Sequence, residues 1–148
     1  GRNLQRRLIE DMREVALGTV NNWCKGVIVW NLMLDTERGP NREGGCRTCY
    51  GAVDIDKSDY KTMTYNSHYY IIGHLSSVVK PGAFRIESKS DRDGGLIYSA
   101  FENPDGTVAF VVLNASEDTS GFSVTIDGKN YLNGELPAKS VGSYLWKK

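Results

Sequence analysis

The chain has 148 residues, of which 40% are hydrophobic and 24% charged, a composition typical of one ordinary globular domain or two small ones. Lys plus Arg number 18 and Asp plus Glu number 18, so the formal net charge is zero and no long-range field attracts nucleic acid or an anionic membrane. No apolar run approaches the roughly 18 to 20 residues that span a bilayer, so no transmembrane segment is expected. The sequence opens with Gly-Arg-Asn, without a signal-peptide core, so we expect any targeting segment to lie upstream or to have been removed.

The first predicted element is an amphipathic helix over residues 3–20. Apolar residues recur there with helical spacing, and charged residues occupy the opposite face. Gly18 is expected to end the helix. The apolar positions are Leu4, Leu8, Ile9, Met12, Val15 and Ala16, with Trp23 a further turn on.

An apolar run, GVIVWNLML, follows at residues 26–34. It is short and does not alternate with polar residues, which predicts a strand covered on both faces, as in parallel sheets. Trp30 and Asn31 lie toward its end. Residues 35–60 then form a long polar loop punctuated by glycines, and long loops in compact domains are usually functional or disordered.

A second helix is predicted over residues 62–79 (TMTYNSHYYIIGHLSSVV), stopped by Pro81-Gly82. Beyond it the period changes to two, in five runs separated by turn signals: AFRIES, GLIYSAFEN, TVAFVVLNAS, GFSVTIDG and SVGSYLWK. The pattern predicts an α/β portion over residues 1–80, which is not a complete domain, and an antiparallel all-β sandwich or barrel over residues 81–148.

Five stretches resemble, in order and spacing, the C-terminal third of glycoside hydrolase family 30: NWCKGVIVWNLMLD, TERGPN, YYIIGHLSSVVKPGAFRI, PDGTVAFVVLN and SVGSYLW. That family includes glucosylceramidases and endo-β-1,6-glucanases. The resemblance implies a (β/α)8 barrel fused to a β-sandwich, acting as a retaining β-glycosidase. In this scheme residues 26–34 are similar to the last barrel strand, residues 62–79 to the last barrel helix and residues 82–148 to the sandwich.

The resemblance places Trp30 in the wall of the pocket for the sugar to be cleaved, with Asn31 in a supporting role. An indole face suits the apolar face of a sugar ring, and a nearby amide can bond its hydroxyls. The alternative is that Trp30 is a core aromatic that caps the barrel. The polar residues of the following loop either contact a second sugar or form an ordinary solvated loop: Asp35, Glu37, Arg38 and Asn41.

Retaining hydrolysis requires two carboxyl groups, a nucleophile and an acid/base, roughly 5 to 5.5 Å apart. The resemblance implies that both are Glu residues at the ends of earlier barrel strands, which precede this chain. We therefore expect no catalytic residue here and an inactive chain when it is alone. The Glu residues set aside on this ground are Glu10, Glu14, Glu37, Glu43, Glu87, Glu102 and Glu117.

Cys46 and Cys49 form a CxxC in a Gly-rich loop. They are expected either to be bonded, which would fit a secreted or periplasmic protein, or to remain a reduced surface pair. Cys24, beside Trp23, is expected in the core. A zinc site with His68 and His74 is not expected, because two residues six apart on one helix face different directions. His74 is expected to be a packing histidine bonded to backbone.

No nucleotide-binding, serine-hydrolase or zinc-protease motif occurs, and no cofactor is expected. The expected partners are a β-glucoside or β-glucan and either the missing barrel portion or further copies of the chain, because a single barrel strand leaves both edges unpaired. The alternative function is a stand-alone carbohydrate-binding or structural β-sandwich. Tyr144 and Trp146, which share one face of the closing strand, would then have to form an exposed platform.

Overall fold

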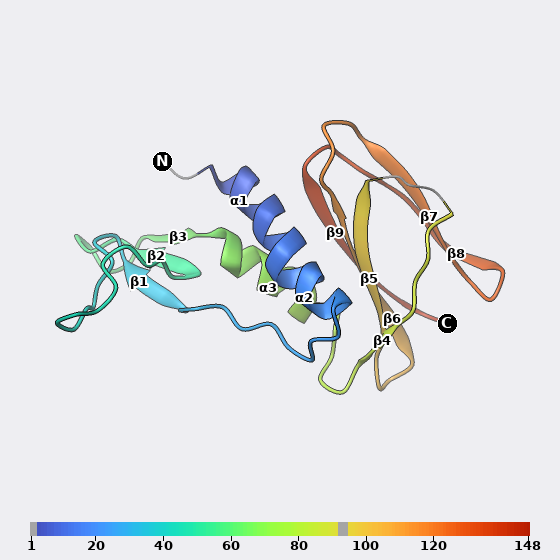
Figure 1. The fold of residues 1–148 in the computed structure, drawn as a ribbon, viewed down its shortest axis with the longest axis horizontal. Helices are drawn as coiled ribbons and strands as arrows, with labels where there is room; N and C mark the ends of the chain where they lie inside the picture. The colour runs from blue at the N-terminus through green and yellow to red at the C-terminus, as the bar shows by residue number, and fades with distance from the viewer. Residues whose placement is uncertain (1–2, 92–94) are drawn as a thin grey trace.

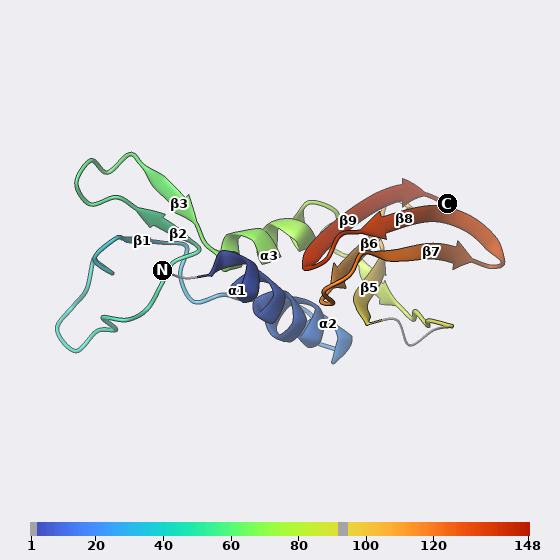
Figure 2. The same cartoon turned by 90° about the horizontal axis from the view of Figure 1, so that it is seen from above.

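The computed structural model describes residues 3–91 and 95–148. Three layers follow one another: a small three-stranded sheet, a pair of helical segments and a β-sandwich (Figures 1 and 2). Within the described residues, no helix is long and apolar enough to cross a membrane.

The predicted first helix is present as a continuous helical rod. It consists of α1 (Leu4–Asp11), the π-helical segment η1 (Met12–Leu17) and α2 (Gly18–Asn21). Asn3 caps it, because its side-chain oxygen accepts a hydrogen bond from the Arg6 amide at 3.0 Å. Gly18 does not end the rod, contrary to expectation. A Cβ there would lie 2.6 Å from the carbonyl oxygen of Arg13, so the missing side chain lets the wide π turn continue.

In this chain the predicted strand over residues 26–34 is not formed over most of its length. The only strand in this region is β1 (Met33–Asp35), which begins near the end of the predicted one. Residues 26–30 belong to no strand and join none of the described sheets. Their burial still alternates with the period of a strand, as described below.

β1 is one edge of a small mixed sheet in the order β1-β2-β3. β2 (Val53–Ile55) is parallel to β1, with Leu34 opposite Asp54, and antiparallel to β3 (Met63–Tyr65). β2 and β3 lie within residues predicted as loop and helix. The predicted second helix is therefore shorter than expected. It is α3 (Ser67–Ser76), and its buried Ile71 packs toward α1.

The β half confirms the predicted antiparallel strands. One sheet has the order β4-β5-β6-β9 and a separate hairpin pairs β7 with β8. The five predicted runs contain β4 (Phe84–Ile86), β5 (Leu96–Glu102), β6 (Thr107–Asn114), β7 (Ser120–Ile126) and β9 (Ser140–Lys147). β8 (Lys129–Leu136) was not predicted, because its sequence KNYLNGEL is poor in strand-forming residues. The tight Asp127-Gly128 turn brings β8 back against β7. Both turn residues have positive φ, 50° and 78°.

The larger sheet is covered on both faces. Ala109, Val111 and Leu113 of β6 face the helices and share one core with Met12, Leu17, Ile71 and other helical residues. Phe110 and Val112, which alternate with them, face the β7–β8 hairpin. All eight residues of β6 are buried for this reason. The helices and the sheet therefore share a hydrophobic core across residue 80.

His74 joins α3 to β9. Its Nδ1 lies 2.9 Å from Oγ of Ser143, and that hydroxyl also donates a hydrogen bond to the backbone oxygen of His74, at 2.9 Å. The expectation of a packing histidine is met, but the imidazole bonds a side chain rather than backbone. Burial lowers the pKa of His74 below its ordinary value, because desolvation penalises the charged ring.

We expect the free energy of unfolding of the 148-residue chain to fall as the pH drops below about 6.5. In that range the unfolded chain binds a proton at His74 that the folded chain does not. Because the ring is only partly buried, the free energy of unfolding should change by less than ~1.4 kcal/mol per pH unit. His74→Asn should remove this part of the pH dependence in urea unfolding between pH 5 and 8. An unchanged profile in the variant would show that His74 is not responsible.

Candidate functional site

Trp30 and Asn31 lie just before β1, on the segment that leads from the helical rod to the small sheet (Figure 1). The backbone oxygen of Asn31 accepts a hydrogen bond from the Ala52 amide at 2.8 Å, and its side-chain oxygen accepts one from the Met33 amide at 3.1 Å. Trp30 is 72% exposed. Trp30 is therefore outside the core of this chain, and Asn31 fixes the turn beside it.

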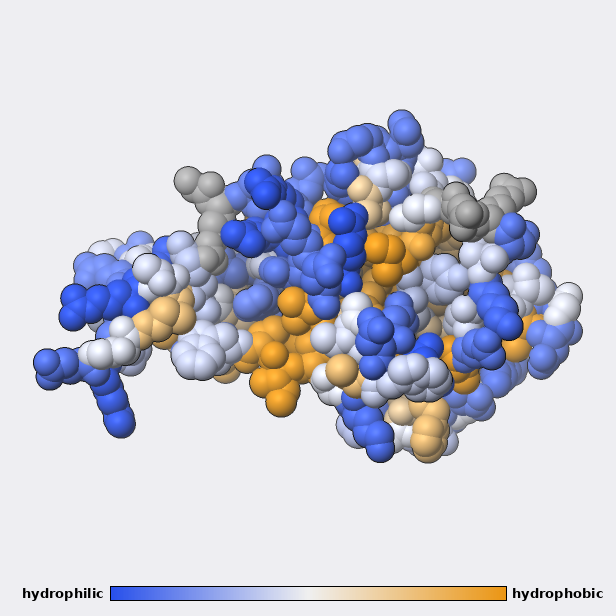
Figure 3. All heavy atoms as spheres, in the orientation of Figure 1, coloured by the Kyte–Doolittle hydropathy of each residue, from blue (hydrophilic) through white to orange (hydrophobic). Residues whose placement is uncertain are grey.

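The segment around Trp30 has two faces. Val27 and Val29 pack against the helical core, whereas Ile28, Trp30 and Leu32 are 94%, 72% and 73% exposed. Figure 3 shows apolar side chains gathered along this segment beneath the helices. Isolated apolar residues on a surface need no explanation, but a contiguous stripe of this kind indicates a surface that something else covers.

The loop after β1 is organised by Asp35, which is 8% exposed. Its Oδ1 accepts hydrogen bonds from the amides of Glu37 at 2.9 Å and Gly39 at 2.7 Å. The carboxylate of Asp35 is thus held by hydrogen bonds from the backbone of its own turn. Glu37 is exposed and paired with Lys57, so neither acidic residue is arranged as a catalytic group.

Cys46 and Cys49 are joined by a disulfide, with 5.6 Å between their Cα atoms, in the exposed part of the same loop. Cys24 is a free thiol and exposed, not in the core as expected. The reason is that Trp23 has a left-handed φ of 69° and turns the chain away from the helix axis. Trp23 itself is 81% exposed, and the guanidinium of Arg85 lies 4.4 Å from the centre of its ring.

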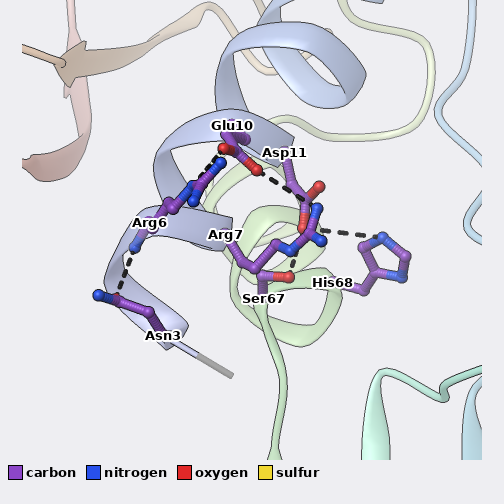
Figure 4. A network of polar contacts seen from close by, with 7 residues as sticks. All are labelled: Asn3, Arg6, Arg7, Glu10, Asp11, Ser67 and His68. Atoms are coloured by element: carbon purple, nitrogen blue, oxygen red, sulfur yellow. Dashed lines mark hydrogen bonds and ion pairs between the residues drawn. The ribbon is translucent and has the colours of Figure 1, made fainter. Parts of the chain in front are cut away.

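His68 and Ser67 meet Asp11 where α3 begins beside α1 (Figure 4). The Ser67 hydroxyl donates to Oδ2 of Asp11, and Nε2 of His68 lies 3.8 Å from the same oxygen. A nucleophilic triad would require the hydroxyl to bond the imidazole, which this cluster lacks. The cluster ties two helices together. In the part of the chain that the structure describes, no three His, Cys, Asp or Glu side chains gather to hold a metal ion.

The carboxyl groups whose pKa values are shifted are not suited to act as a general acid. Within residues 3–91 and 95–148, Glu10, Asp59 and Asp105 have resolved shifts, and all three pKa values are lowered, chiefly by hydrogen bonds from Arg6, Thr62 and Lys80. A carboxylic acid that protonates a leaving group needs a raised pKa.

A polar groove of about 630 Å³ was not foreseen from the sequence. It lies where α1, the loop, β2, β3 and the start of α3 meet, so its residues come from separate stretches of the chain and no local motif contains them. The clearest signal in the sequence is Asp54, a charged residue at the centre of the apolar strand β2. The lining residues are Leu4, Arg7, Arg38, Tyr50, Asp54, Thr64, Tyr65, Asn66 and Ser67.

Comparison with known proteins agrees with this architecture. Residues 82–144 match the profile of the glycosyl hydrolase family 30 beta sandwich domain. The solved structure of the endo-beta1,6-glucanase BT3312 superposes on 100% of this chain and 33% of its own, with a TM-score of 0.94 and 65% sequence identity. The chain matches the C-terminal portion of glycoside hydrolase family 30. The resemblance seen in the sequence is therefore confirmed.

Curated relatives match most of this chain over only part of their own length. Endo-1,6-beta-D-glucanase neg1 of Aspergillus fumigatus is 31% identical over 137 residues, 89% of this chain and 28% of that protein. Lysosomal acid glucosylceramidase of Mus musculus is 29% identical over 119 residues, 80% of this chain and 22% of that protein. This chain thus spans between about a fifth and a third of the length of these relatives. The barrel origin of residues 1–80 stays a prediction.

Proposed function

We propose that this chain forms one wall of the sugar pocket, and the C-terminal β-sandwich, of a retaining β-glycosidase that hydrolyses β-1,6-linked glucan. The observation that carries the proposal is the 65% identity, over the whole chain, to a solved endo-β-1,6-glucanase. Glucosylceramide is the other substrate that the relatives' names suggest. The two domains are residues 1–80, the end of a (β/α)8 barrel, and residues 81–148, the sandwich.

The two faces of the segment before β1 support the barrel assignment. Side chains of a barrel strand point alternately to the surrounding helices and to the interior. Val27 and Val29 contact the helical core, so Ile28, Trp30 and Leu32 would face the barrel interior. Trp30 would then lie toward the C-terminal end of the last barrel strand, the end at which such barrels carry their active sites.

In this scheme Trp30 stacks against the apolar face of the sugar to be cleaved, while Asn31 fixes the backbone beside it. The nucleophile and the acid/base, roughly 5 to 5.5 Å apart, would come from earlier barrel strands, and the reaction requires only these carboxyl groups and water. The partner of residues 1–80 is therefore the rest of the barrel. The Cys46–Cys49 disulfide supports a secreted or periplasmic enzyme.

The alternative of a stand-alone carbohydrate-binding module lacks its key feature. Tyr144 and Trp146 pack against the cluster between the sheet and the β7–β8 hairpin instead of forming an exposed aromatic platform. We therefore assign the sandwich a structural role within the enzyme.

The test uses the enzyme in which this chain follows a complete barrel, here called the barrel-extended enzyme. It should release oligosaccharides from linear β-1,6-glucan and leave β-1,4-glucan intact. Equal cleavage of both polymers would contradict the proposed substrate, whereas cleavage of glucosylceramide alone would favour the glucosylceramidase-like relatives.

A further inference from the structure

Asn66 lies where β3 passes into α3, at the N-cap position of the helix (Figure 1). An Asn at this position usually accepts a hydrogen bond from a backbone amide of the first helical turn. Within the part of the chain that the structure describes, the Asn66 side chain makes no such capping bond. Its amide nitrogen instead donates to the backbone oxygen of Gly51 at 3.0 Å, across a separation of 15 residues. The side chain of Asn66 thus connects α3 to another segment.

The segment that Asn66 holds consists of Gly51 and Ala52, just before β2. The backbone amide of Asn66 donates to the backbone oxygen of Ala52 at 2.8 Å, so the two hydrogen bonds fix two successive carbonyl groups. Ala52 is 4% exposed. Gly51 lies so close to β1 that a Cβ on it would be 2.8 Å from the backbone nitrogen of Leu34. The segment is therefore closely packed between β1 and the start of α3.

The amides on the other side of this segment bond to the residues that follow Trp30. The Ala52 amide donates to the backbone oxygen of Asn31 at 2.8 Å, and the Val53 amide donates to that of Leu32 at 2.9 Å. A series of hydrogen bonds consequently runs from the start of α3, through Ala52, to the residue next to Trp30.

The position of the Trp30 ring depends on this backbone. The ring is 72% exposed, so packing within this chain fixes it only weakly. Its placement follows from the backbone at Asn31, whose side-chain oxygen accepts a hydrogen bond from the Met33 amide at 3.1 Å. A misplacement of about 1 Å in a group that contacts the substrate can lower a reaction rate about 100-fold. A residue that fixes the Asn31 backbone therefore affects the pocket without contacting the sugar.

We propose that Asn66 is a positioning residue of the glycosidase, which acts through Gly51, Ala52 and Asn31 on the Trp30 wall of the pocket. The proposal rests on the proposed function for the role of Trp30. An ordinary helix cap would stabilise α3 and leave the pocket unchanged. The two roles of Asn66 therefore differ in their effect on the reaction.

In the barrel-extended enzyme, Asn66→Ala should lower kcat/KM for an aryl β-glucoside about five- to ten-fold. The variant loses the donor to Gly51 but keeps the backbone bond to Ala52, so its effect should be smaller than that of Trp30→Ala. Asn66→Asp should lose at least as much activity, because it places a carboxylate against the carbonyl oxygen of Gly51. Asp is as good an N-cap as Asn, so retained activity in Asn66→Asp would show a capping role and overturn the proposal.

The double variant Asn66→Ala/Trp30→Ala separates positioning from a general structural effect. If Asn66 acts through Trp30, its removal has no further effect once the ring is absent, and the double variant should have the kcat/KM of Trp30→Ala. Independent effects multiply instead. A double variant about five- to ten-fold less active than Trp30→Ala would overturn the proposal.

Asn3→Ala is the matched control. Asn3 is the N-cap of α1, and its side-chain oxygen does accept a hydrogen bond from the Arg6 amide. Its replacement should lower the stability of the enzyme and leave kcat/KM unchanged. If Asn3→Ala lost as much activity as Asn66→Ala, the removal of any helix cap would have this effect, and the proposal would be wrong.

Amide hydrogen exchange in the barrel-extended enzyme distinguishes a failure of this proposal from a failure of the proposed function, because it requires no substrate. The amides of Ala52 and Val53, which donate to the segment after Trp30, should exchange about five-fold faster in Asn66→Ala. Asn3→Ala should leave their exchange unchanged. Faster exchange in Asn66→Ala alone supports its role even if the enzyme cleaves no β-glucoside, whereas unchanged exchange overturns it.

Discussion

Trp30→Ala in the barrel-extended enzyme is expected to lower kcat/KM for an aryl β-glucoside about ten- to hundred-fold. Trp30 is 72% exposed in this chain, so its removal leaves the helical core intact while it deletes the aromatic wall of the proposed pocket. The loss of a large aromatic contact corresponds to about 1.5–3 kcal/mol, and each 1.4 kcal/mol or so is a factor of ten in rate.

Trp23→Ala is the matched control for this prediction. Trp23 is also an exposed indole, but it precedes the segment and packs against Arg85 near the sandwich. The control should retain its kcat/KM. If both variants lose activity equally, or if neither does, Trp30 does not line the pocket.

Asn114→Ala is expected to lower the free energy of unfolding by about 3 kcal/mol. Asn114 is fully buried at the end of β6, and its amide nitrogen contacts the carbonyl oxygens of Asp118, Leu136 and Pro137 at 2.7 to 3.0 Å. The side chain thereby fastens the larger sheet to the end of the β7–β8 hairpin. Its removal leaves buried carbonyls without a donor, which costs more than the hydrogen bonds themselves contribute.

Urea unfolding of the 148-residue chain measures this effect. Asn114→Asp should be at least as destabilising, because it replaces the donor by a carboxylate that faces the same carbonyl oxygens. Asn130→Ala, at an exposed position of β8, should change the free energy of unfolding by less than about 0.5 kcal/mol. Equal midpoints for Asn114→Ala and Asn130→Ala would refute the role of Asn114.

The parts of the fold that were predictable carry their own local signal. The run TVAFVVLN became β6, buried on both faces, because a continuous run rich in β-branched and apolar residues suits no exposed element. The helical spacing of Ile9, Met12 and Ala16 likewise identified the buried side of the first rod. In both cases the pattern depends on residues close together in the sequence.

The predictions that this chain does not meet depended on partners or backbone geometry that a pattern does not contain. Residues 26–30 have the composition of a buried strand, but a strand requires neighbours with which to bond. Gly18 has the usual identity of a helix end, but here it accommodates a π turn. Cysteine is an apolar residue type that is usually buried, and only the left-handed turn at Trp23 places Cys24 outside the core.

The candidate site was predictable where one motif contains it. Trp30 and Asn31 could be proposed because they lie together in a stretch that resembles the family, and the structure adds which face of the segment Trp30 occupies. The groove at Asp54 was not predictable, because Arg7, Asp54 and Ser67 become neighbours only when two helices and a small sheet pack together.

The central claim is that this chain shapes the pocket while the catalytic carboxyl groups lie on another part of the enzyme. Release of nitrophenol from an aryl β-glucoside, by the 148-residue chain alone and by the barrel-extended enzyme, tests it most directly. The account predicts turnover by the barrel-extended enzyme only. Turnover by the 148-residue chain at an enzyme-like rate would contradict it and would make Glu37 and Glu43, in the loop after Trp30, the first carboxyl groups to mutate.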